Sequence, residues 1–388
     1  GVRWLGGRWK GCHDYTTNVA EDMFRIDEDN LGEMVVVPET TLRSLLPEGL
    51  AGHGRTVAER ANGFCTLQRE ATKSVQDWMW ARREAGFPFP SGPEGTFLVD
   101  GLEGAGKSHV MNQAVMWARS QGWLTLYVND AGSLIFEGDR IRPSAVVDGC
   151  YDQLDHKFED GPALLMLENL AEVHGSMLGA IPCKRDFRTS WGFESAASNP
   201  VSIRDLLESG IAASGRGCAP EAFYHVRQEV NLVTEVPVLI AVDGYSAFCA
   251  PCAFVDMEAV DVTKPHKKYP PMPSSRLTTV RALELEDDGC HSLVNGVYLI
   301  SREHTHKNVF FDQRFGSVFP TENVVEVPPL AFNESRSLVR SVASRTDYNP
   351  HIDPDGDGGE ITDRTIAYIQ LTTGGIPKEV WHYVERLI

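Results

Sequence analysis

One stretch of eight residues constrains the fold more than any other part of the sequence. Gly101-Leu-Glu-Gly-Ala-Gly-Lys-Ser108 fits the phosphate-binding pattern of Gly, four residues and Gly-Lys-Ser. An apolar, strand-like run from Thr96 to Val99 precedes it and a helical run from His109 to Arg119 follows it, which is the context that the pattern requires. A glycine-rich turn that matches by chance has no reason to be flanked in this way. The sequence therefore predicts a strand, a phosphate loop and a helix in direct succession.

The residue types in this loop indicate its chemistry. Glycines let backbone N–H groups approach phosphate oxygens without a Cβ in the way, and the following helix presents its positive N-terminal end to the same anion. We expect the Lys107 ammonium to reach the β- and γ-phosphates and the Ser108 hydroxyl to bind Mg²⁺. The candidate nucleotide-binding residues in this stretch are Gly101, Glu103, Gly104, Ala105, Gly106, Lys107, Ser108 and His109.

Later strands supply further candidate residues. The run from Val236 to Val242 is apolar without alternation, as in a strand buried on both faces, and it ends at Asp243. A carboxylate at this position is expected to hold Mg²⁺ directly or through water, so Ser108 and Asp243 are the predicted metal ligands. A second buried run, Gly296 to Ser301, ends in polar residues, and Ser301 and the following arginine either sense the γ-phosphate or form a solvated turn.

The last candidate residue opens the last predicted helix, Pro377 to Leu387. Gly375-Ile-Pro377 places a proline in the first turn of that helix. In signal-transducing ATPases with a helical lid, a similar Gly-x-Pro lies against the nucleotide, and an ordinary helix start explains the pattern equally well. Pro377 therefore joins Asp243 and Ser301 among the candidate nucleotide-binding residues.

The residue after Asp243 bears on hydrolysis. Hydrolytic members of the additional-strand ATPase class usually place a water-activating Glu there, and this chain has Gly244. Asp130 closes a neighbouring strand and Glu103 lies in the loop, but a strand-end Asp is as often a cap and a loop Glu as often points to solvent. The sequence therefore predicts slow hydrolysis and no catalytic residue.

The order of elements predicts an α/β P-loop NTPase of AAA-like type, with a parallel five-stranded sheet, helical insertions and a C-terminal helical lid. The five strands are expected at Thr96–Val99, Leu124–Val128, Val236–Val242, Gly296–Ser301 and Asn323–Val327, with a mostly helical insertion over 131–236. A helical pattern over Thr56–Ala85 precedes them, and an N-cap at Asn333 begins the lid. The predicted units are an N-terminal extension (1–52), a nucleotide-binding domain (53–330) and the lid (331–388).

Composition limits the partners. The net charge of −18 repels phosphate backbones, so protein partners are favoured, contact with RNA must be local, and DNA is not expected. No apolar run is long enough for a membrane span. The eight cysteines are scattered, and Cys249-Ala-Pro-Cys252 would need two further ligands, such as Cys290 and His291, to hold a metal. Asp353-Pro-Asp-Gly-Asp-Gly358 begins like a calcium loop but has Arg364 where the bidentate Glu is required.

Several segments together resemble one known family. They are the phosphate loop, Gln121 to Asp130, Val238 to Phe248 with its Ala-Val-Asp-Gly, and the lid ending in Gly-Gly-Ile-Pro. These segments are similar to death-associated protein three, the GTP-binding protein of the mitochondrial ribosomal small subunit, and the similarity extends over about residues 65–388. Residues 1–52 and the Pro-rich loop (264–273) find no clear counterpart.

The resemblance implies a mitochondrial, ribosome-bound protein. It implies GTP or GDP with Mg²⁺ as the ligand, and neighbouring small-subunit proteins as the main partners in the head of the subunit. Two other classes of protein share the loop. A free regulatory switch ATPase would need turnover on a working timescale, against which Gly244 speaks, and a small-molecule kinase would need an acceptor pocket with a base and mobile arginines, which no residue pattern singles out.

Overall fold

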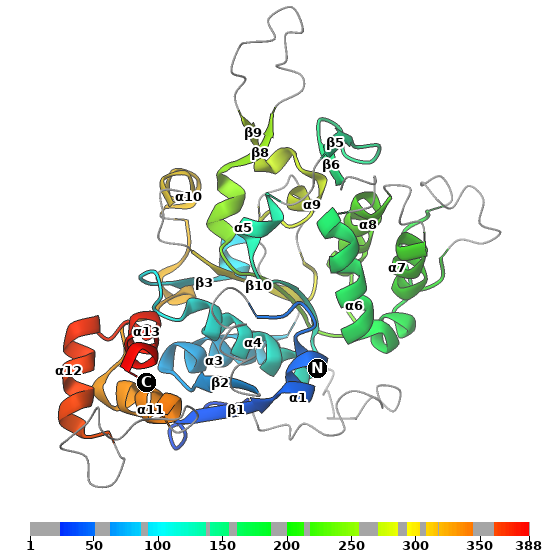
Figure 1. The fold of residues 1–388 in the computed structure, drawn as a ribbon. Coiled ribbons are helices and arrows are strands. Elements are labelled where there is room, and N and C mark those ends of the chain that lie inside the picture. Colours follow the sequence, from blue (N-terminus) through cyan, green and yellow to red (C-terminus); the bar gives the residue numbers. More distant parts are fainter. Residues whose placement is uncertain are drawn as a thin grey trace, which may run out of the picture.

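The computed structural model describes most of the chain (Figure 1). The described residues are 24–50, 63–86, 92–136, 140–154, 161–187, 200–212, 218–255, 271–285, 293–302, 308–316, 318–343 and 361–387. Residues 1–23 of the predicted extension, residues 264–270 of the Pro-rich loop, Cys290 with His291, and the acidic stretch at 353–358 lie outside them.

A five-stranded parallel sheet forms the centre of the fold, as predicted. Its order is β11 (Val324–Glu326), β3 (Thr96–Asp100), β10 (Gly296–Ser301), β7 (Val238–Val242) and β4 (Leu124–Val128). The strands β4 and β10 have the predicted bounds, β3 is one residue longer, and β7 and β11 are shorter. Because β10 lies between β3 and β7, the sheet has the additional strand of the predicted class.

Both faces of the sheet are buried, which accounts for the unbroken apolar runs. Successive side chains of a strand point to opposite faces, so the residues of β7 divide between two cores. Leu239 and Ala241 enter the core beneath α4 (Lys107–Ser120), whereas Ile240 and Val242 enter the other core. Figure 1 shows α3 (Glu70–Ala85) and α4 on one side of the sheet and the inserted elements on the other.

The inserted elements cover the face of the sheet opposite α3 and α4 (Figure 1). They include α5 (Ala131–Leu134), the hairpin β5 (Arg140–Pro143) and β6 (Tyr151–Leu154), α6 (Gly161–Ala180), α7 (Ile203–Ala212) and α8 (Ala219–Asn231). After β7 come β8 (Pro251–Val255) paired with β9 (Pro271–Pro273), α9 (Thr278–Arg281) and α10 (Asn308–Phe315). The predicted helical insertion is thus present, with a hairpin added to it. None of the helices in the described ranges is long and apolar enough to cross a membrane.

The predicted helix over Thr56–Ala85 is wrong in its first part. Residues 56–62 lie outside the described ranges, and Gly63–Leu67 form strand β2, which pairs antiparallel with β1 (Met34–Pro38). Helix begins only at Glu70, in α3. The partner strand lies about thirty residues earlier and is followed by α1 (Glu39–Leu45), so the pairing depends on tertiary contacts that a helical period cannot reveal.

The helices after residue 330 pack around a small core of their own. These are α11 (Phe332–Ala343), α12 (Asp363–Thr373) and α13 (Pro377–Leu387), and their core includes Val339, Ile366 and Val380 together with Leu67 of β2. The predicted N-cap at Asn333 is wrong, because α11 already begins at Phe332. The Glu334 carboxylate accepts the Ala331 N–H instead, at 2.7 Å.

Candidate nucleotide-binding site

The phosphate loop lies at the carboxyl end of β3, as in other open α/β sheets with a ligand at this edge. Gly101 has φ of 137°, and a Cβ there would come 2.6 Å from the Val327 carbonyl oxygen. Gly104 has φ of 77°, and a Cβ there would come 3.0 Å from the Lys378 Cβ. Glycine is therefore required at both positions by backbone conformation and by close approach of other segments.

Lys107 folds back over the loop that precedes it. Its side chain is largely buried, and Nζ donates to the carbonyl oxygens of Gly101 at 2.8 Å and Leu102 at 2.9 Å. The ammonium is thus held on the inner side of the loop rather than in solvent. In this position it can contribute positive charge to an anion enclosed by the loop.

Asp243, Ser108 and Ser301 come together at the ends of β7, α4 and β10. The Asp243 carboxylate is buried and forms side-chain hydrogen bonds with both serines. Ser301 Oγ also accepts the Gly244 N–H at 2.8 Å. Burial raises the pKa of Asp243, while the two serine hydroxyls and the Lys107 charge act in the opposite direction. A hydroxyl beside a buried carboxylate provides the oxygen ligands that Mg²⁺ takes, together with phosphate oxygens and water.

His109 is placed differently from the other loop residues. His109 is half-buried on the first turn of α4, where desolvation and then the charge of Arg69 lower the pKa of His109 to about 4. The ring is therefore neutral near pH 7, and it adds no positive charge beside the loop. The backbone N–H of His109 donates to the Gly106 carbonyl oxygen at 3.0 Å, so that N–H belongs to the helix.

The side chains near the loop that might act on water have other roles. Asp130 accepts the Ser133 N–H at 3.1 Å and caps α5, while the Glu103 side chain is 69% exposed and lies 3.5 Å from the Lys378 ammonium. Arg302, at the end of β10, forms ion pairs with Asp100 at 2.7 Å and with Asp312 at 2.6 Å. Each of these three side chains is thus engaged by a partner other than the loop backbone.

The lid touches the phosphate loop directly. The Lys378 backbone N–H donates to the Gly104 carbonyl oxygen at 3.4 Å, and Pro377 Cγ lies 3.9 Å from where a Cβ of Gly106 would be. Gly375 accepts the Leu330 N–H at 2.7 Å, which fastens this segment to the chain after β11. Gly375-Ile-Pro377 therefore lies against the loop.

Arg69 is a further residue at the loop that the motifs did not indicate. Its guanidinium is buried and donates to the Ala105 carbonyl oxygen at 2.7 Å. A single arginine at the start of a helix, 36 residues before its partner in the sequence, carries no motif. Only its position within the segment that resembles the family singles it out.

Cys249 ends the short 3-10 helix Tyr245–Cys249, and Cys252 lies in β8. Neither forms a disulfide, and Cys249 is half-buried while Cys252 is buried. Across the described ranges, no group of three or more His, Cys, Asp or Glu side chains is arranged to hold a metal ion.

Comparison with known proteins identifies the family. The family model described as mitochondrial ribosomal death-associated protein 3 matches residues 69–267, just over half of the chain. No curated protein sequence matches. A solved structure of the Aeropyrum pernix ORC2 protein in ADPNP–ADP complexes aligns with 94% of this chain and 71% of that chain, at 12% identity and a TM-score of 0.33, which is too distant to inform function. The chain belongs to the mitochondrial ribosomal death-associated protein 3 family, as its sequence predicted.

Proposed function

We propose that the protein binds GTP or GDP with Mg²⁺ at the phosphate loop and hydrolyses it slowly if at all, as a structural component of the mitochondrial ribosomal small subunit. Its family is mitochondrial and ribosomal, which supports that location. The nucleotide, the small subunit and the structural role belong to the proposal. The candidate binding residues are those of the loop, His109, Asp243, Ser301 and Pro377.

One observation carries the nucleotide proposal: the Ser108 hydroxyl, on the first turn of α4, is hydrogen-bonded to the buried Asp243 carboxylate, directly after β7. A buried carboxylate is costly unless it is paired, and this one faces the end of a phosphate loop. Mg²⁺ would supply positive charge that neutralises phosphate oxygens. Ser108 and Asp243 would hold it, and Lys107 would bind phosphate oxygens in place of its present carbonyl partners.

The structural role follows from what surrounds Asp243. Gly244 has no side chain, and its N–H is already bonded to Ser301. Removing a positioned base commonly costs between about 10² and 10⁴ in rate. Binding through Lys107 and the loop N–H groups does not depend on such a base, so tight binding can accompany slow turnover.

Thermal unfolding tests nucleotide binding. In the wild type, nucleotide at a hundred times its dissociation constant stabilises the fold by about 2.7 kcal/mol. We expect Lys107→Ala to remove this shift, because the only ammonium in the loop is lost. Lys184→Ala is the control, since Lys184 pairs with Glu235 outside the loop. Equal nucleotide-induced shifts in wild type and Lys107→Ala would refute the site.

Competition between guanine and adenine triphosphates tests the base. The preference for guanine rests on the family, and we place the base between the segment beginning at Arg69 and the lid at Gly375–Pro377, which both contact the loop. A preference for adenine, with turnover near one per second in single-turnover assays, would favour a regulatory switch ATPase instead.

The charge of the chain bears on its proposed partners, and the packing of its segments bears on its proposed domains. We propose protein contacts with neighbouring small-subunit proteins and only local contact with rRNA, because the net charge of −18 opposes wider contact. We also propose residues 53–330 as the nucleotide-binding domain and 331–388 as its lid, with 1–52 as an extension of which residues 24–50 pack against the domain. Co-sedimentation with the small subunit after a high-salt wash tests the ribosomal role.

A further inference from the structure

Arg69 joins three parts of the chain that lie far apart in sequence. Its Nη1 donates to the Ala105 carbonyl oxygen of the phosphate loop at 2.7 Å, and its Nη2 to the Pro328 carbonyl oxygen after β11 at 2.6 Å. Its Nε donates to Glu334 Oε1 of the lid helix α11 at 3.1 Å. The side chain is 6% exposed and that of Glu334 is 18% exposed. One guanidinium therefore donates to acceptors from the loop, from the segment after β11 and from the lid.

The contact with Ala105 determines the direction of a loop N–H. In a trans peptide the carbonyl group and the following N–H point in opposite directions. Holding the Ala105 carbonyl toward Arg69 therefore turns the Gly106 N–H away from Arg69. Backbone N–H groups of this loop are the donors that the proposed phosphate contact uses, so Arg69 orients one of them without touching the ligand.

The contact with Glu334 connects the same arginine to the lid. The second carboxylate oxygen of Glu334 accepts the Ala331 N–H at 2.7 Å, so this side chain both closes the first turn of α11 and binds Arg69. The neighbouring loop residue, Gly104, is bound by the Lys378 N–H of α13. The lid thus reaches two consecutive loop residues, one directly and one through Arg69.

We propose that Arg69 is a positioning residue that couples the phosphate loop to the lid, so that nucleotide binding and lid docking stabilise each other. The coupling is reciprocal: a nucleotide that orders the loop tightens the lid, and a partner that holds the lid raises nucleotide affinity by the same factor. The inference rests on the proposed nucleotide binding, and it adds a role for a residue outside the loop motif.

Two variants separate this role from general stability. Arg69→Lys keeps the positive charge and loses the three-acceptor fork. Glu334→Gln keeps an acceptor for Ala331 and weakens only the contact between Arg69 and the lid. Arg82→Lys is the matched control, because Arg82 lies in the helix α3 that Arg69 precedes and donates to the exposed Glu94 carbonyl oxygen at 3.3 Å.

Hydrogen exchange of the lid amides and nucleotide affinity are measured on the full chain, with and without Mg²⁺–GDP. We expect Arg69→Lys to bind nucleotide about tenfold or more weakly, as for loss of hydrogen bonds to a charged group. In Arg69→Lys and in Glu334→Gln, nucleotide should no longer slow exchange in α12 and α13, whereas Arg82→Lys should behave as the wild type. Glu334→Gln decides the matter if Arg69→Lys does not fold.

The two proposals fail in different ways. If the wild type binds nucleotide and the two variants keep full lid protection, the coupling is refuted and nucleotide binding stands. If the wild type binds no nucleotide, the nucleotide proposal and the ligand-dependent coupling both fall. Even then, the ligand-free proteins test the link between loop and lid. Lid amides that exchange at the same rate in the variants as in the wild type would refute that link, and faster exchange in the variants would support it.

Discussion

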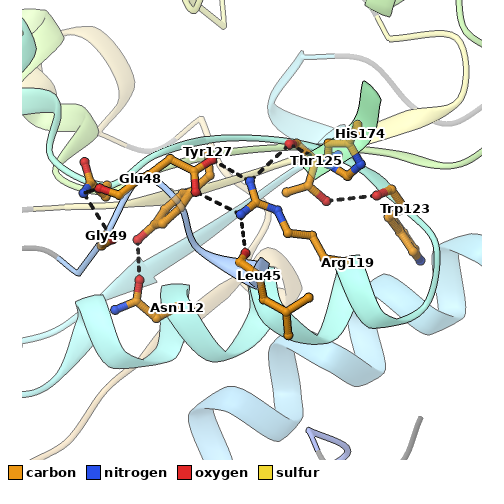
Figure 2. A network of polar contacts seen from close by, with 10 residues as sticks. Leu45, Glu48, Gly49, Asn112, Arg119, Trp123, Thr125, Tyr127 and His174 are labelled. Atoms are coloured by element: carbon orange, nitrogen blue, oxygen red, sulfur yellow. Dashed lines mark hydrogen bonds and ion pairs between the residues drawn. The ribbon is translucent and has the colours of Figure 1, made fainter. Parts of the chain in front are cut away.

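Replacing Arg119 should greatly lower the free energy of unfolding, because its guanidinium is the centre of a buried network (Figure 2). It donates to both carboxylate oxygens of Glu48, at 2.9 and 2.6 Å, to the Leu45 carbonyl oxygen, and to the Thr125 carbonyl oxygen at 3.4 Å. The side chains of Arg119 and Glu48 are only 2% and 7% exposed. The network thus fastens the segment after α1 to α4 and to the edge strand β4.

The size of the effect follows from what is left behind. Arg119→Met leaves the Glu48 carboxylate buried without its cation, and removing one partner of a buried ion pair typically costs about 3–5 kcal/mol. Replacing both partners with apolar residues is often neutral, so Arg119→Met with Glu48→Leu should recover most of that loss. Leu45 and Thr125 still lose a hydrogen bond each in the double variant, so recovery should be incomplete.

Equilibrium urea unfolding, followed by circular dichroism and tryptophan fluorescence, measures the change. The matched control is Arg43→Met, because Arg43 forms an ion pair with Glu39 on α1 while 79% exposed, and such pairs contribute at most about 1 kcal/mol. A loss below about 1 kcal/mol for Arg119→Met, or a double variant less stable than the single one, would contradict the reasoning.

Two further predictions concern the inserted helices. Burial, and next the charge of Asp152, raise the pKa of Glu221 above its ordinary value of 4.5. The folded state therefore binds this proton more tightly than the unfolded state. The resulting stability is complete below about pH 4.5 and is lost as pH rises through the raised pKa. Melting temperatures should therefore show Glu221→Gln gaining on the wild type from pH 4.5 to 7, and an opposite trend would disprove the assignment. Gly210→Ala should cost about 1–3 kcal/mol, because its Cβ would lie 2.5 Å from the Ala222 Cβ between α7 and α8, as denaturant titration would show. Gly175→Ala in α6 has nothing within 4 Å of its Cβ and should instead gain up to about 1 kcal/mol, so equal effects of the two alanines would contradict this packing.

The central sheet could be predicted because its signals are local. Each of its strands is a short apolar run bounded by polar or glycine residues, and β4 and β10 were placed to the residue. The loop between β3 and α4 is equally local, since its glycines and Lys107 are consecutive in sequence. These features need no knowledge of a distant partner.

The remaining contacts depend on partners far away in the sequence. Strand β2 forms because β1 lies beside it, so the helical pattern does not hold for residues 63–67. Arg69 and Glu334 are 265 positions apart, and neither has a motif. The contact between Lys378 and Gly104 likewise joins the end of the chain to the loop. Each of these contacts exists only once the sheet has brought the segments together.

The placement of these contacts is consistent with the proposed slow turnover. The loop is contacted by Arg69 from before the sheet, by Val327 directly after the last strand and by Lys378 from the lid, so a ligand that orders the loop would also support three other segments. Such a ligand stabilises the folded state by a free energy that rises with the ratio of its concentration to its dissociation constant. An enzyme that released its product in each cycle would lose this support each time. With Gly244 after Asp243, the bound nucleotide would persist, and the lid would remain docked for its neighbours.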